Sequence, residues 1–162
     1  MVRVPKRWVA LGVAAAAVAT VAAVRSGGPG SGHGVSGADA AAGQQAYAVA
    51  RQEFGRLSGG NWAGAWQLWT ADAQDAVPQD EFVRANTECR PALGIPYVLG
   101  TGSRTGPDAF QVSWTHGGAQ GANTLRRTAG HWRFAPDPQT LAAFRGGADS
   151  VVRQRRASGS CH

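Results

Sequence analysis

The stretch AFQVSWTHGGAQGANTLRRTAGHWRF, residues 109–134, decides the expected fold of this chain. Bulky side chains alternate with small polar ones in 109–116, and the same period of two recurs in 131–134, as is typical of β-strands. The pairs Gly117-Gly118 and Ala129-Gly130 separate the strands and favour tight turns. The stretch therefore predicts antiparallel strands over 109–116, 121–128 and 131–134.

The segments on either side of these strands extend the prediction. The apolar run IPYVLG at 95–100 predicts one more strand before the hairpins. After the last strand, Asp137 is placed to cap a short helix over 138–145, whose first residue is Pro138. Residues 146–162 are polar and rich in arginine, and we expect them to form a flexible basic tail.

Helical periodicity dominates the part of the chain before the strands. The first predicted helix, 38–57, carries one apolar stripe at helical spacing. The stripe consists of Tyr47, Ala50, Phe54 and Leu57. Two shorter helices are predicted over 61–70, with Asn61 as its cap, and over about 79–89.

Three tryptophans mark the second of these helices. Trp62, Trp66 and Trp69 stand at positions i, i+4 and i+7, so they share one helical face. Aromatic side chains at this spacing fill a small core more simply than they form an exposed stacking platform.

This order of elements defines the fold class. Helices followed by a run of antiparallel strands indicate an α+β fold rather than an alternating β-α-β fold. We expect a curved antiparallel sheet that packs on the N-terminal helices and buries the apolar stripe. One domain, 38–145, would contain all of these elements.

The N-terminus has the features of an export segment. Three cations in 1–7 precede residues 8–24, which contain no charged side chain. Residues 1–25 are therefore interpreted as a cleaved signal peptide or as an uncleaved membrane anchor, since their length reaches the lower limit for a span. The preceding cations would keep the N-terminus in the cytoplasm. The domain would then face outside the cell membrane, or be secreted, beyond a Gly/Ser-rich linker at 26–37.

The charge distribution disfavours nucleic acid as a partner. The net charge of +6 arises at the two ends of the chain, whereas residues 26–144 contain eight arginines and nine acidic residues. A nucleic-acid-binding domain is expected to carry a basic face on its folded part.

The chain has two cysteines, Cys89 and Cys161. An even number of cysteines in an exported protein permits a disulfide, which here would fasten the tail to the third helix. The alternative is a buried Cys89 with a free Cys161.

Three stretches together suggest a family. They are Trp62, Trp66 and Leu68 after a helix that ends in Gly-Gly, the helix start Pro78-Gln79-Asp80-Glu81-Phe82, and Leu125-Arg126-Arg127 leading through Gly130 to Trp132-Arg133-Phe134. From about 42 to 136 the chain resembles the nuclear transport factor 2-like superfamily. The resemblance implies a cone-shaped α+β fold with an internal cavity. Exported bacterial versions of this fold are often tethered domains of unknown role, and the superfamily also includes ketosteroid isomerases and polyketide cyclases.

The resemblance implies four candidate side chains for such a cavity: Trp66, Tyr97, Trp114 and His116. His116 ends a predicted strand on the same face as Trp114, and there it could act as a general acid or base. Tyr97 could stabilise a developing oxyanion. The structural alternatives are a strand-end histidine satisfied by solvent and an aromatic residue of the core or rim.

The sequence contains no motif for metal binding, for a serine hydrolase or for phosphate binding. The four histidines form no i, i+4 pair and there is no Cys-x-x-Cys, so we predict no metal site. Neither a nucleophile elbow nor a phosphate loop occurs, and no cofactor is predicted. Two functions stay open: a non-enzymatic domain that binds a protein or a small molecule, and a small isomerase or cyclase with His116 as its acid or base.

Overall fold

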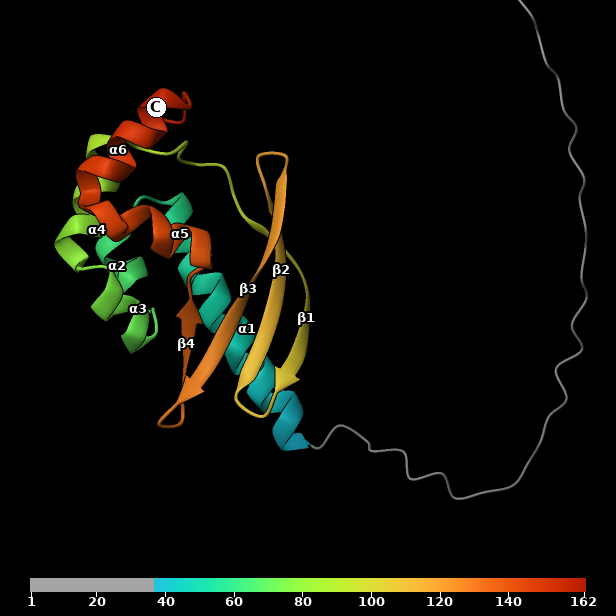
Figure 1. Ribbon diagram of the computed structural model, residues 1–162. Helices are drawn as coiled ribbons and strands as arrows, with labels where there is room; N and C mark the ends of the chain where they lie inside the picture. Colours follow the sequence, from blue (N-terminus) through green and yellow to red (C-terminus); the bar gives the residue numbers. More distant parts are fainter. Residues whose placement is uncertain (1–36) are drawn as a thin grey trace, which may run out of the picture. The chain divides into compact units, whose positions relative to one another are not determined.

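A computed structural model describes residues 37–162 (Figure 1). These residues form a four-stranded antiparallel sheet with helices before and after it in the chain, so the predicted α+β class is confirmed. The elements are α1 (Gly37–Ser58), α2 (Trp62–Trp66), α3 (Ala71–Ala76), α4 (Gln79–Glu88), β1 (Val98–Gly106), β2 (Ala109–His116), β3 (Ala119–Thr128), β4 (His131–Ala135), α5 (Pro138–Ala143), a 3-10 turn (Phe144–Gly146) and α6 (Gly147–Ala157). The predicted signal peptide or anchor, 1–25, and the predicted linker up to residue 36 lie outside the described residues.

The sheet is a simple meander in the order β1-β2-β3-β4. Two-residue turns join β2 to β3 and β3 to β4. They consist of Gly117-Gly118 and Ala129-Gly130, the two dipeptides that predict turns in the sequence. The backbone of Ala129 and Gly130 has φ values of 50° and 82°, which is the left-handed geometry that tight hairpins require. The register places Leu125 opposite both Phe110 and Phe134, which gathers large side chains on one face of the sheet.

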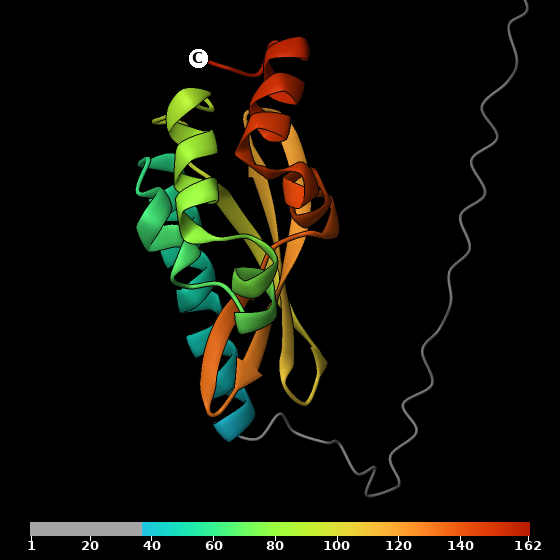
Figure 2. The same cartoon turned by 60° about the vertical axis from the view of Figure 1, so that its left-hand side comes forward.

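Helix α1 lies along this face of the sheet (Figures 1 and 2). Its buried residues include Ala46, Ala50 and Phe54. The Phe54 ring meets the Phe134 ring edge-on, with 5.4 Å between the centroids. Small alanines on one side of the helix let its backbone approach the strands, while Phe54 fills the space between them.

The first strand is displaced from its predicted position. Residues 95–100 were expected to form it, but β1 starts at Val98 and continues to Gly106. Pro96 has no N–H to donate to a ladder, which disfavours a strand at that point. The polar residues of β1 are held in the sheet by pairing with β2, for example Ser103 opposite Gln111.

The predicted helix over 61–70 is wrong in length. The Asn61 side chain accepts from the Gly64 N–H, as predicted for a cap, but α2 ends at Trp66. Beyond it, the N–H of Thr70 donates to the Phe134 carbonyl and the N–H of Phe134 donates to the Leu68 carbonyl. Hydrogen bonds to β4 thus replace further helical turns.

The prediction of a flexible tail over 146–162 is also wrong, because Gly147–Ala157 is helical. Helix α6 buries Ala148, Val151 and Val152 and lies beside α4 (Figure 2). These positions share one helical face, although the arginines around them give the sequence a polar appearance. The folded unit therefore extends past the predicted boundary at residue 145.

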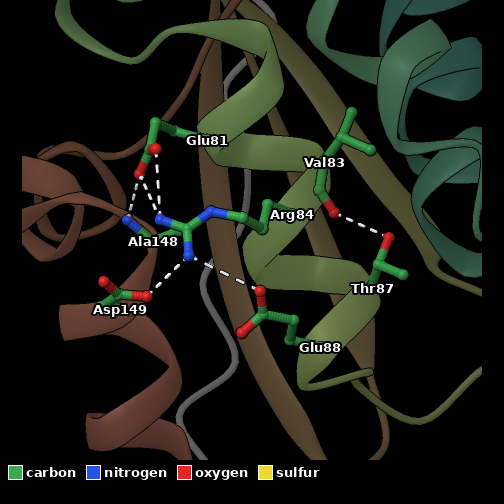
Figure 3. Close-up of polar contacts among 7 residues, drawn as sticks. All are labelled: Glu81, Val83, Arg84, Thr87, Glu88, Ala148 and Asp149. Atoms are coloured by element: carbon green, nitrogen blue, oxygen red, sulfur yellow. Dashed lines mark hydrogen bonds and ion pairs between the residues drawn. The ribbon is translucent and has the colours of Figure 1, made fainter.

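Polar contacts hold the start of α6 against α4 (Figure 3). Arg84 Nη1 lies 2.6 Å from Asp149 Oδ1. The second terminal nitrogen of Arg84, Nη2, donates a hydrogen bond to Glu81 Oε1 at 3.2 Å. The second oxygen of Glu81 accepts from the backbone N–H of Ala148, near the N-terminus of α6. The hydrogen bond and charge of Arg84 lower the pKa of Asp149.

A disulfide fixes the other end of α6. Cys89 follows α4, and its sulfur is bonded to that of Cys161. The His162 N–H also donates to the Arg90 carbonyl. Both ends of the C-terminal helix are therefore attached to α4 or to the chain just after it.

Within residues 37–162, no helix has the length and apolarity that a membrane span requires. The segment predicted to enter the membrane, 8–24, is not among these residues.

Candidate functional site

An aromatic cavity of about 280 Å³ lies between α1, α4, the sheet and α6. Seven phenylalanine, tyrosine and tryptophan side chains line it: Phe54, Trp62, Trp69, Phe82, Tyr97, Trp114 and Phe134. Polar lining residues include Glu53, His116 and Arg155. A mostly apolar wall with a few convergent polar groups is the usual character of a small-molecule site.

The two candidate catalytic residues, His116 as acid or base and Tyr97 as oxyanion donor, both line this cavity. Their rings stack on each other, with centroids 3.9 Å apart and planes 11° from parallel. The other face of Tyr97 stacks on Phe54 at 4.5 Å. Tyr97 and His116 therefore form part of one aromatic stack, rather than two groups that converge on a common point.

Burial affects the polar atoms of this stack. Desolvation, with a smaller contribution from the charge of Glu53, raises the pKa of Tyr97. His116 Nδ1 is buried and has no hydrogen-bond partner within the described residues. The imidazole thus offers an unsatisfied nitrogen beside the cavity.

Trp114, another of the candidate side chains, also lines the cavity. Its Nε1 donates to Asn123 Oδ1 at 2.7 Å, which fixes the orientation of the indole. A Cβ at Gly121 would lie 2.5 Å from the Trp114 ring, so only glycine permits this close contact across the strands.

Trp66 is not among the residues that line this cavity. Its Nε1 donates to the Val77 carbonyl at 2.7 Å, and its own carbonyl accepts from Gln74. The indole therefore connects α2 to the end of α3. Trp62 and Trp69 contribute to the cavity wall in its place.

Sequence reasoning missed Glu53, which is the most unusual group of the cavity. Its side chain is fully buried on α1, and Oε1 accepts from Trp69 Nε1 at 3.0 Å. The pKa of Glu53 is raised to about 8, because desolvation outweighs the Trp69 hydrogen bond and the charge of Arg56. One signal was present in the sequence: position 53 lies three residues after Ala50 and four before Leu57, which is on the apolar stripe.

Arg155 brings a cation from α6 to the cavity wall. Its Nη1 donates to Asn86 Oδ1 at 2.9 Å and to the Cys89 carbonyl at 3.3 Å. Desolvation lowers the pKa of Arg155. Because Cys89 carries the disulfide, the position of this guanidinium depends on the same junction that fastens the C-terminus.

Residues 37–162 contain no cluster of three or more histidine, cysteine or acidic side chains that could hold a metal ion. The polar groups of the cavity come from separate elements and are suited to hydrogen bonding. The chemistry that the described site supports is thus recognition of a small molecule, or proton exchange with one.

Comparisons with protein-family models, with curated proteins and with solved structures found no match for this chain.

Proposed function

We propose that residues 37–162 form a non-enzymatic binding domain whose cavity receives a small, largely apolar molecule. The observation that carries this proposal is the aromatic cavity itself, with buried polar atoms of Glu53 and His116 that have no partner in the described part of the chain. Buried polar atoms are normally paired, so an occupant that satisfies them would gain binding free energy.

The fold family and the compartment are part of the same proposal. We infer a cone-shaped domain of the nuclear transport factor 2-like kind, exported and either tethered to the cell membrane or secreted. The order of helices and strands and the three stretches quoted above support this family. The uncharged run at 8–24 after three cations supports export.

Naphthalene binding tests the proposed cavity, because the probe is apolar and aromatic like the cavity wall. Leu57→Trp enlarges a lining side chain on α1 and is expected to weaken binding by about tenfold or more, since small steric changes in an apolar pocket have effects of this size. Isothermal titration calorimetry measures the affinity. Gln52→Trp makes the same addition at an exposed position of α1 and should leave the affinity unchanged.

Absence of naphthalene binding to the wild-type protein would contradict the proposal. An equal loss of affinity in the Leu57→Trp and Gln52→Trp variants would also contradict it, because the effect would then not come from the cavity.

A small isomerase or cyclase remains the second candidate. The pKa of Glu53, at about 8, lies close to neutrality, where a carboxyl group exchanges protons effectively. Glu53 would then be the acid or base, rather than His116, whose ring stacks on Tyr97. Deuterium exchange next to the carbonyl of methyl naphthyl ketone in heavy water distinguishes the two functions. Exchange that is lost in Glu53→Gln would favour the enzyme.

A further inference from the structure

The carboxyl group of Glu53 has one satisfied and one unsatisfied oxygen at the cavity wall. Oε1 accepts from the indole N–H of Trp69, which itself lines the cavity. Oε2 is buried and has no hydrogen-bond partner among the described residues. The carbonyl oxygen of a carboxylic acid is a better acceptor than its hydroxyl oxygen, so with Oε1 accepting from Trp69 a proton on this carboxyl is placed on Oε2.

The surroundings of Glu53 favour that protonated form. Arg56 on the same helix is the cation whose charge acts against it, but desolvation is the larger effect and the pKa lies at about 8. The other ionisable residues of the cavity wall are Tyr97 before β1, His116 at the end of β2, Asp137 before α5 and Arg155 on α6. The carboxyl is therefore mostly protonated at neutral pH, and no hydrogen bond between described residues uses Oε2.

We propose that Glu53 donates its carboxyl proton to a hydrogen-bond acceptor on a neutral, planar aromatic ligand in the cavity. This inference rests on the proposed binding function and adds the chemical class of the ligand. The cavity is walled by rings, several of which already pack edge-to-face, such as Tyr97 and Trp114 at 5.5 Å. A flat aromatic molecule continues this packing and brings its acceptor to Oε2.

The residues that line the cavity also disfavour a charged ligand. An organic cation would share the cavity with Arg155, and Glu53 could pair with it only after losing its proton. A neutral ligand avoids both costs, because transfer of an unpaired charge from water into an apolar site is unfavourable. Among neutral ligands of equal size, one with a hydrogen-bond acceptor should then bind more tightly than one without.

Three probes with the same bicyclic aromatic frame test the proposal on the full protein. Naphthalene has no acceptor, quinoline replaces one C–H with an acceptor nitrogen, and N-methylquinolinium carries a positive charge. At about pH 7 we expect quinoline to bind about tenfold more tightly than naphthalene, the ratio expected for one net hydrogen bond. N-methylquinolinium should bind more weakly than either.

The pH dependence provides a measurement that requires no variant. Above a pH of about 8, Glu53 ionises and can no longer donate. The affinity for quinoline should then fall by about tenfold per pH unit until it equals that for naphthalene. Calorimetric titrations with both probes at several pH values give this profile.

Glu53→Gln tests whether this residue is the donor. The amide of glutamine is also a donor but does not ionise, so the variant should keep its preference for quinoline and lose the decline at high pH. Glu88→Gln is the matched control, since it makes the same chemical change at an exposed glutamate of α4 that does not line the cavity. Its profile should follow that of the wild type.

Equal affinities for naphthalene and quinoline would overturn the inference while leaving the proposed binding function intact. Tighter binding of N-methylquinolinium would overturn it as well, because Glu53 would then bind as a carboxylate. An unchanged pH profile in Glu53→Gln would show that another group is the donor. If naphthalene itself does not bind to the wild-type protein, the proposed function fails.

Discussion

Replacing Cys161 with serine is expected to lower the free energy of unfolding by about 4 kcal/mol. The disulfide with Cys89 closes a loop with a sequence separation of 72 residues, and a cross-link of this span strongly restricts the unfolded chain. Denaturant unfolding of the Cys161→Ser variant and the wild type, both without reductant, measures the difference.

Two controls accompany this experiment. Ser160→Ala alters a neighbouring exposed residue, keeps both sulfurs, and should change the stability by less than about 0.5 kcal/mol. Reduced wild-type protein should unfold at the same denaturant concentration as Cys161→Ser. Equal stability of the variant and the non-reduced wild type would mean that the bond does not form in the protein.

Replacing Glu53 with glutamine is expected to stabilise the protein by on the order of 3 kcal/mol at about pH 7. The pKa of Glu53 is raised from 4.5 in the unfolded chain to about 8 in the folded protein, so the native state retains a proton that the unfolded state has lost. The contribution of Glu53 to stability is therefore most favourable below the unfolded pKa. It declines by about 1.4 kcal/mol per pH unit as the pH rises to about 8, and is constant above that.

The measurement is the difference in unfolding free energy between the variant and the wild type as a function of pH. It should be small at about pH 4.5 and increase towards about pH 8, while the contributions of other groups cancel in the difference. Glu88→Gln makes the same chemical change at an exposed glutamate of α4 and is the matched control for Glu53→Gln. A difference that stays constant over this pH range would show that Glu53 is charged in the native protein.

The hairpins and the first helix could be predicted because their signals are local. A two-residue turn with glycine defines where the chain reverses, and alternation on either side defines the face of each strand. The stripe that contains Ala50 and Phe54 predicted the side of α1 that is buried. In these elements, neighbouring residues and tertiary contacts favour the same structure.

The length of α2 and the existence of α6 could not be predicted because they depend on distant residues. Residues 68–70 leave the helical path to bond Phe134, which is more than sixty residues away in the chain. Helix α6 has few apolar residues, and its attachment depends on Arg84 and on Cys89, both on or next to α4. Short-range patterns contain no information about such partners.

The candidate site was predictable only in part. Tyr97, Trp114 and His116 were placed in a cavity on the basis of a resemblance, and all three line one. Glu53 was overlooked because a glutamate in a helix usually faces solvent. Its burial depends on the Trp69 indole, which reaches it from a segment sixteen residues further along the chain.

The hydrogen bond between Trp69 and Glu53 also gives the protein an internal optical reporter. Loss of the carboxyl proton places a negative charge beside the indole nitrogen, and the electric field of that charge shifts the emission of this fluorophore. Occupation of the cavity changes the polarity around the same ring. The part of the intrinsic fluorescence that comes from Trp69 can therefore follow both the ionisation of Glu53 and the arrival of a ligand without an added label.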